Sequence, residues 1–122
     1  MLYDSNALWQ INMPANFRLL VIDNGGGNIF NIIPGPDKHP SVNHHFTSPH
    51  NVAIHQVLQA LGLKSREGRA NKNNSSLDVD MKWLLDPSKE ARGLVVHTDG
   101  QHSAAILKQY FTEVKKLQEK DN

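Results

Sequence analysis

The sequence of 122 residues contains no cysteine. Without thiols, the chain has no disulfide bond, no thiolate metal site and no cysteine nucleophile. It also lacks long hydrophobic runs, and none approaches the about 20 residues that a membrane-spanning helix needs. Its first residues, MLYDSNALWQ, show neither the basic start nor the long apolar stretch of a signal peptide. These absences predict a cytoplasmic protein with no membrane span.

The net charge of the chain is also small. Lysine and arginine number 13 against 12 acidic residues, which gives a formal net charge of +1 with neutral histidines. This balance argues against nucleic acid or an anionic membrane surface as a partner held by bulk charge. Hydrophobic residues make up 39% of the chain, enough for a core, and the length suits one domain or a piece of a larger one.

Apolar residues follow two kinds of pattern. Continuous apolar runs within residues 17–24 (FRLLVIDN) and 93–100 (GLVVHTDG) predict strands that are buried on both faces, as in a parallel sheet. Helical spacing predicts helices over residues 51–63, 75–85 and 101–117, and weaker signals indicate a short helix at 5–11 and a polar edge strand at 64–70. Helices and strands that alternate in this order predict a three-layer α/β/α sandwich with a parallel sheet.

The last predicted helix has a marked apolar stripe. Leu107, Tyr110, Val114 and Leu117 are spaced three or four residues apart, and we expect them to belong to the core. Asp99 directly precedes this helix, where its carboxylate can accept hydrogen bonds from first-turn N–H groups.

Three consecutive glycines, in IDNGGGNIF at residues 22–30, directly follow the first predicted strand. Glycine loses more conformational entropy on folding than other residues, so three in a row need a reason. Ligands of open α/β sheets bind at the carboxyl ends of the strands, and a glycine run lets the backbone approach a ligand closely. The amide oxygen of Asn24 and the carbonyls after it are hard ligands that suit Mg²⁺. A simple flexible turn is the alternative.

Four stretches together resemble a known family: LYDSNAL at 2–8, LLVIDNGGGNIFNIIP at 19–34, FTSPHNVAIHQVLQALGLK at 46–64 and TDG at 98–100. They are similar to the C-terminal, diphosphate-binding domain of the thiamine-diphosphate-dependent synthases of the menaquinone pathway. Those enzymes form 2-succinyl-5-enolpyruvyl-6-hydroxy-3-cyclohexene-1-carboxylate. The reaction that the resemblance implies is decarboxylation of 2-oxoglutarate and addition of the succinyl unit to isochorismate.

The resemblance also implies a site, with thiamine diphosphate and Mg²⁺ as cofactors. Asn24 matches the family's side-chain Mg²⁺ ligand, and Gly26 matches the position whose backbone carbonyl binds the metal. Gly25, Gly27 and Ile29 match the neighbouring cofactor-binding positions. Phe30 and Ile33, with Ile29, match apolar residues that line the cofactor and substrate pocket.

Two features of the family are missing from this chain. The Gly-Asp pair that supplies the charged Mg²⁺ ligand would lie before Met1, and the catalytic glutamate belongs to a separate N-terminal domain. The resemblance therefore implies that residues 1–122 form a single partial domain, truncated at its N-terminal side and inactive alone. The implied partners are the missing N-terminal domains of the same polypeptide, small-molecule substrates, and further subunits in a homodimer or homotetramer.

Other readings of the sequence stay open. The parent protein can be another thiamine-diphosphate enzyme, such as an acetolactate-synthase-like enzyme or a 2-oxoacid decarboxylase. A non-catalytic metal-binding module is suggested by five histidines at 39, 44, 45, 50 and 55. His97, Asp99 and His102 in HTDGQH could form a metal or acid–base cluster, although a strand end and a helix cap account for His97 and Asp99 equally well.

Overall fold

The computed structural model describes residues 2–9, 12–33, 35, 39, 41, 45–70 and 75–119. The chain divides into two compact units. The first consists of Met1–Asp23 and Val52–Thr98, and the second of Asn24–Asn51 and Asp99–Asn122. Each unit is described by itself below. His44, one of the histidines of the metal-module reading, lies outside the described residues.

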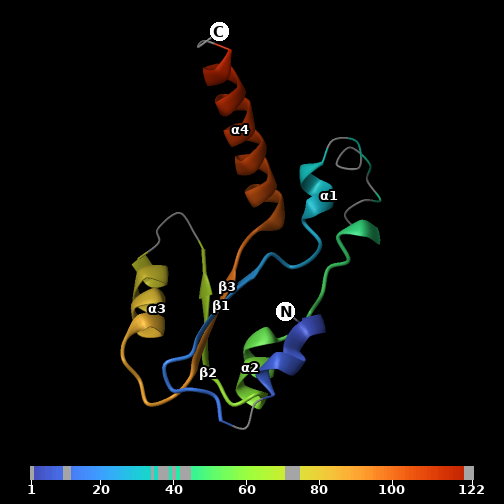
Figure 1. Cartoon of the computed structure of the whole chain (residues 1–122). Coiled ribbons are helices and arrows are strands. Elements are labelled where there is room, and N and C mark those ends of the chain that lie inside the picture. Colours follow the sequence, from blue (N-terminus) through green and yellow to red (C-terminus); the bar gives the residue numbers. More distant parts are fainter. Residues whose placement is uncertain are drawn as a thin grey trace. The chain divides into compact units, whose positions relative to one another are not determined.

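The first unit is built around a parallel sheet of three strands (Figure 1). These strands are β1 (Arg18–Asp23), β2 (Lys64–Arg69) and β3 (Arg92–His97), in the order β1-β3-β2. Both neighbours of β3 run parallel to it. The positions of the strands and their parallel direction confirm the predicted α/β fold, with β2 as the predicted polar edge strand.

Helices cover both faces of this sheet (Figure 1). On one face, α2 (Ile54–Ala60) buries Ile54 and Leu58 against Val21 and Val95, and the 3-10 helix η1 (Leu2–Leu8) adds Leu8 to the same cluster. On the other face, α3 (Ser75–Leu85) packs Leu84 with partly buried side chains against strand β3. The residues buried there are Leu84, Leu94 and Val96. The first unit therefore has the three layers predicted from the sequence.

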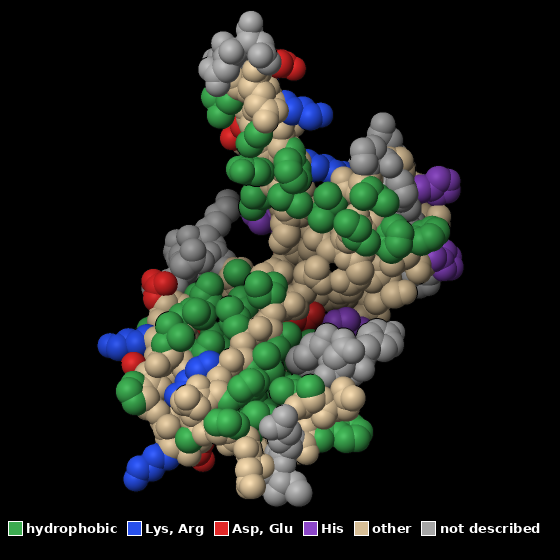
Figure 2. Space-filling model, in the orientation of Figure 1, with side chains coloured by type: hydrophobic (Ala, Val, Ile, Leu, Met, Phe, Trp, Pro, Cys, Tyr) green, Lys and Arg blue, Asp and Glu red, His purple; other side chains and the backbone are tan. Residues whose placement is uncertain are grey.

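The two edges of the sheet differ in composition. The β2 edge has the sequence KSREGR, and charged side chains of this kind prevent pairing with a further strand. The β1 edge has the sequence RLLVID, yet Leu20 is 44% and Ile22 is 69% exposed. Figure 2 shows hydrophobic side chains gathered along this edge. The prediction that this strand is buried on both faces was thus wrong for the face that carries Leu20 and Ile22, because α3, the helix on that face, packs on β2 and β3.

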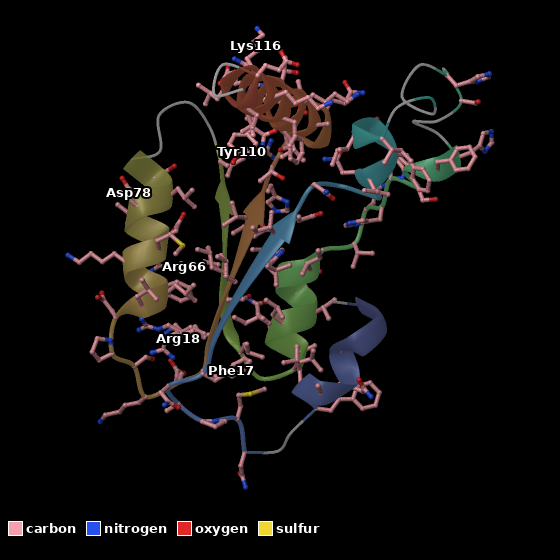
Figure 3. The ribbon with its side chains drawn as sticks, turned by 45° about the horizontal axis from the view of Figure 1, so that its top comes forward. Phe17, Arg18, Arg66, Asp78, Tyr110 and Lys116 are labelled. Carbon is pink, nitrogen blue, oxygen red and sulfur yellow. The ribbon has the colours of Figure 1, made fainter. Side chains whose placement is uncertain are left out.

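Arginines join the amino end of the sheet to the end of α3. Arg18, labelled at the start of β1 in Figure 3, donates from Nη2 to the carbonyl of Asp86 at 3.0 Å. Arg92 donates to the carbonyls of Trp83 and Asp86. The guanidinium groups of Arg66 and Arg92 lie 4.4 and 5.0 Å from the centroid of the Trp83 ring. The last carbonyls of α3 thereby gain cationic donors, which also suit the negative end of the helix dipole.

The second unit contains α1 (Ile29–Ile32), which the sequence did not predict, and the long helix α4 (Gly100–Gln118). The two helices contact each other. Tyr110 projects from α4 and is 58% exposed, and Leu117 is 62% exposed (Figure 3). The prediction that the whole stripe is core was wrong for these two residues, whereas Leu107 and Val114 are half-buried. Among the described residues, no helix combines the length and apolarity needed to cross a membrane.

Candidate functional site

The carboxyl ends of the strands bring polar residues of the first unit together. In the parallel register, Asp23 is paired with His97, which in turn is paired with Arg69. Asp23 is only 9% exposed although it is charged. Main-chain bonds also join these ends, since the N–H of Thr98 donates to the carbonyl of Asp23 at 2.8 Å. The glycine segment therefore begins directly after a firmly held strand end.

Two histidines and two carboxylates form a chain of contacts at this edge. His97 Nδ1 lies 3.2 Å from Asp23 Oδ2, and His97 Nε2 lies 3.0 Å from Glu67 Oε1. The same oxygen of Glu67 lies 2.9 Å from His55 Nδ1. Glu67 and His97 also line a cavity of about 390 Å³ together with Gly68, Arg69, Ser76 and Asp80. The sequence reading missed this cluster, because its members are far apart in the chain and only the strand register brings them together.

The glycine segment forms a tight turn at the start of the second unit. Gly25 has φ of +77°, a backbone conformation that residues with a side chain rarely adopt. Nothing lies within 4 Å of the place where its Cβ would be. The N–H of Gly26 donates to Asn24 Oδ1 at 3.2 Å. Asn24 itself is exposed. The side chain predicted to bind Mg²⁺ is thus on the surface, with its oxygen fixed beside the turn.

Gly26 and Gly27 lie against the backbone of the segment that follows α1. A Cβ at Gly26 would overlap the carbonyl oxygen of Thr47, and a Cβ at Gly27 would lie 3.3 Å from the carbonyl oxygen of Phe46. The N–H of Gly27 donates to the same Thr47 carbonyl at 2.6 Å. Close backbone packing therefore accounts for the missing side chain at Gly26 in this structure. Its predicted contact with a metal-bound diphosphate stays a prediction.

The apolar residues predicted to line a pocket lie in and next to α1. Ile29 is 55% exposed and Ile33 is 37% exposed. Phe30 is partly buried and packs on Phe46, with ring centroids 5.2 Å apart and ring planes inclined by 49°. Offset and tilted aromatic pairs of this kind are favourable arrangements. Ile29 and Ile33 thus provide apolar surface that is open to a neighbour, whereas Phe30 is held by its aromatic partner.

The start of α4 lies next to the glycine turn within the second unit. Asp99 caps the helix as predicted, because the N–H of His102 donates to Asp99 Oδ1 at 2.7 Å. A Cβ at Gly100 would lie 3.1 Å from the carbonyl oxygen of Asn24 and 3.2 Å from Asn28 Oδ1. The predicted alternative of a cluster of His97, Asp99 and His102 is not what the described contacts show. Asp99 serves as a helix cap, and His97 binds other carboxylates.

The histidine-rich metal reading receives no support from the described residues. Within that part of the chain, no group of three or more histidine, aspartate or glutamate side chains is placed to hold a metal ion. His39 has its Nδ1 3.0 Å from Ser41 Oγ, and His55 contacts Glu67.

The first unit is an α/β fold with a parallel sheet, and its strand β1 leads directly into the glycine turn. Proteins with open parallel sheets of this class bind ligands at the carboxyl ends of their strands. No family model matches the chain. Several curated proteins that share one name are nevertheless similar to it in sequence. The chain is 42% identical over 117 residues to the 2-succinyl-5-enolpyruvyl-6-hydroxy-3-cyclohexene-1-carboxylate synthase of Flavobacterium johnsoniae. The aligned region covers 93% of this chain and 20% of that synthase.

Synthases of the same name from other organisms are also similar. The one from Porphyromonas gingivalis is 32% identical over 113 residues, which is 93% of this chain and 19% of that protein. The one from Desulfotalea psychrophila is 39% identical over 70 residues, which is 57% of this chain and 13% of that protein. The chain thus spans about a fifth of the length of the first and third of these relatives. The resemblance predicted from the motifs is confirmed.

Proposed function

We propose that this chain is the part of a 2-succinyl-5-enolpyruvyl-6-hydroxy-3-cyclohexene-1-carboxylate synthase that binds Mg²⁺ and the diphosphate of thiamine diphosphate. The observation that carries the proposal is the 42% identity to the synthase of Flavobacterium johnsoniae over 93% of the chain. The whole enzyme would decarboxylate 2-oxoglutarate and transfer the succinyl unit to isochorismate in menaquinone biosynthesis. Its cytoplasmic location stays a prediction from the sequence.

The chemistry of the glycine turn supports this proposal. Mg²⁺ prefers oxygen ligands and usually keeps few protein ligands, with phosphate oxygens and water in the remaining positions. Asn24 offers an exposed amide oxygen with two lone pairs, of which the Gly26 N–H engages one. The carbonyl of Gly26 offers a second neutral oxygen in the same turn. This donor set fits a Mg²⁺ ion that also needs an anionic ligand from elsewhere in the polypeptide.

We propose roles for the other site residues that fit their positions. Gly25 gives the turn its left-handed backbone, and Gly27 fixes the turn to Thr47. Ile29 and Ile33 would form an apolar wall beside the cofactor and substrate, with Phe30 as its support. When bound, thiamine diphosphate supplies the nucleophilic carbon and the electron sink for decarboxylation. The residues of this chain would anchor it, orient it and exclude water from one side.

Exposed apolar surface supports a role within a larger polypeptide. Within the part of the chain that the structure describes, large apolar side chains of β1 and of α4 stay exposed (Figure 2). The large exposed residues of these two elements are Leu20, Ile22, Ile106, Tyr110, Phe111 and Leu117. The relatives have about four-fifths of their length outside the matched part, which is enough chain to cover such surfaces. We propose those segments, and a second subunit, as the partners of this chain.

The test measures synthase activity in the full-length polypeptide that contains this chain. Asn24→Ala should lower kcat/KM at limiting Mg²⁺ by about 100-fold, which corresponds to about 2.7 kcal/mol, and high Mg²⁺ should restore part of it. Asn51→Ala is the matched control, because Asn51 is an exposed asparagine of the same unit. Wild-type activity of Asn24→Ala at limiting Mg²⁺ would contradict the metal role. Turnover of pyruvate instead of 2-oxoglutarate and isochorismate would indicate a different thiamine-diphosphate enzyme.

A second measurement tests whether this chain is a complete site. Isothermal titration of the 122-residue chain with Mg²⁺ and thiamine diphosphate should show weak binding, because one neutral side-chain ligand holds Mg²⁺ poorly. Binding below a micromolar dissociation constant would show that no other segment is needed.

A further inference from the structure

One asparagine of the chain directly precedes a glycine. The pair is Asn24-Gly25, and no other Asn-Gly sequence occurs among the 122 residues. In such a pair the main-chain nitrogen of the glycine can attack the side-chain amide carbon of the asparagine, because no Cβ crowds that nitrogen. Asn24 therefore carries a hydrolysable amide next to an internal nucleophile.

The glycine turn leaves this pair open to reaction. Asn24 and Gly25 are both exposed, so water reaches them. Nothing lies within 4 Å of the place where a Cβ of Gly25 would be, which leaves room for a ring on that side of the main chain. The N–H of Gly26 donates to Asn24 Oδ1 at 3.2 Å. A donor at this oxygen stabilises the negative charge that develops there when the amide carbon is attacked.

Two nearby asparagines are in a less reactive setting. Asn28 and Asn31 are half-buried, and each is followed by an isoleucine, whose side chain branches at Cβ and crowds its own main-chain nitrogen. The side-chain oxygen of Asn28 accepts from Nδ2 of Asn31 at 3.0 Å, so the two amides hold each other. These residues therefore serve as internal references for Asn24.

Asp99-Gly100 offers a second comparison within the same unit. An aspartate before a glycine can close the same kind of ring, with loss of water instead of ammonia. Asp99 Oδ1 accepts from the N–H of His102 at 2.7 Å, and Gly100 is the first residue of α4. Ring closure at Asp99 would remove the cap of this helix, so we expect that pair to stay intact while α4 is folded.

We propose that Asn24 is a site of spontaneous deamidation. The nitrogen of Gly25 forms a bond to Cγ of Asn24, the bond from Cγ to Nδ2 breaks, and Nδ2 leaves as ammonia with the proton that the Gly25 nitrogen loses. Water then adds to the resulting succinimide. Cleavage of its bond between Cγ and nitrogen gives aspartate, and cleavage of its bond between the main-chain carbonyl carbon and nitrogen gives isoaspartate. In sum, one amide and one water become one carboxylic acid and one ammonia, with no other reactant.

The reaction changes the charge of the proposed metal ligand. Aspartate at position 24 would place a negative charge on oxygens of the kind that Mg²⁺ prefers. Isoaspartate would lengthen the main chain by one carbon and move the carboxylate. This consequence rests on the proposed function, which makes Asn24 a Mg²⁺ ligand, whereas the deamidation itself does not.

The test incubates the 122-residue chain, without metal or cofactor, at mildly alkaline pH and maps it by mass spectrometry. Trypsin releases residues 19–38, which hold Asn24, Asn28 and Asn31 in one peptide. We expect the mass gain of amide-to-acid conversion at Asn24, as a mixture of aspartate and isoaspartate, while the other two asparagines keep their amides. An intact Asn24 after an incubation that converts it in the urea-unfolded chain would overturn the proposal. Conversion of Asn28 at the same rate, or aspartate as the single product, would also overturn it.

A pair of glycine variants tests the attacking nitrogen. Gly25→Ala places a Cβ beside that nitrogen and should slow the conversion of Asn24 several-fold. Gly35→Ala is the matched control, because Gly35 also has a positive φ, of +104°, and open space at its Cβ position, but does not follow an asparagine. An unchanged rate in Gly25→Ala, or equal slowing in both variants, would overturn the proposal. If Gly25→Ala does not fold, the position and products of the reaction in the unmodified chain decide.

These outcomes are independent of cofactor binding. Failure of Mg²⁺ and thiamine diphosphate to bind to the full-length polypeptide would contradict the proposed function and leave the deamidation of Asn24 unaffected. An Asn24 that stays intact would contradict this inference and leave the metal ligands of the proposed function untouched.

Discussion

Replacing Gly26 by alanine tests why the second glycine of the turn has no side chain. The new methyl group would overlap the carbonyl of Thr47, which also accepts the N–H of Gly27 at 2.6 Å. An additional methyl group in a packed position costs about 1–3 kcal/mol, and a lost hydrogen bond costs about 0.5–1.5 kcal/mol. We therefore expect the turn to be destabilised by about 2–4 kcal/mol in Gly26→Ala.

Hydrogen exchange of the Gly27 amide is the direct measurement, because that amide makes the bond in question. A loss of 2 kcal/mol or more should speed its exchange by about 30-fold or more, at about 1.4 kcal/mol for each factor of ten. Gly25→Ala is the comparison. It meets no atom within 4 Å and suffers only from its φ of +77°, a penalty of about 1–2 kcal/mol.

One result would refute the reasoning. If Gly26→Ala left the exchange of the Gly27 amide unchanged, the close packing against Thr47 would not exist in solution. If Gly26→Ala in the full-length polypeptide lost Mg²⁺ and cofactor binding but kept its stability, the glycine would be required by the ligand rather than by the fold.

Three further predictions concern stability and association. Leu58→Ala removes a fully buried side chain and should cost about 2–5 kcal/mol in urea unfolding, whereas Leu85→Ala, at an exposed position, should stay within about 0.5 kcal/mol. An equal loss of unfolding free energy in the two variants would show that Leu58 is not part of the core. Asp99→Ala should destabilise the start of α4 by about 1 kcal/mol, seen as faster exchange of the His102 amide, and unchanged exchange would argue against the cap. Ile22→Lys should reduce self-association in analytical ultracentrifugation, because it places a charge on the apolar edge strand. Undiminished association would show that the β1 edge is not the surface through which copies associate.

Much of the fold could be predicted from the sequence because its signals are local. Apolar runs located β1 and β3, and helical spacing located α2, α3 and α4 to within a few residues. Asp99 was recognisable as a cap from its place before an apolar pattern. The exposure of Leu20 and Ile22 was not predictable, because an apolar strand sequence shows what the strand can bury and not which neighbour is present.

The site was less accessible to sequence reasoning. The motifs around Asn24 were sufficient to find the relatives, and they located the turn. The cluster of His97 with Asp23 and Glu67 depends on the register of parallel strands that are far apart in the chain. The contact of Gly26 with Thr47 depends on a loop that returns to the turn. Neither long-range pairing leaves a local pattern.

The sheet is held at both of its ends by side chains as well as by the hydrogen bonds between its strands. At the amino end, Arg18 and Arg92 bind carbonyls at the end of α3. At the carboxyl end, His97 of the middle strand contacts Asp23 of β1 and Glu67 of β2. Because successive side chains of a strand point to opposite faces, a shift of β3 by one residue would turn His97 away from both partners. The side chains at the strand ends therefore specify the register that places Asn24 and Asp99 after neighbouring strands.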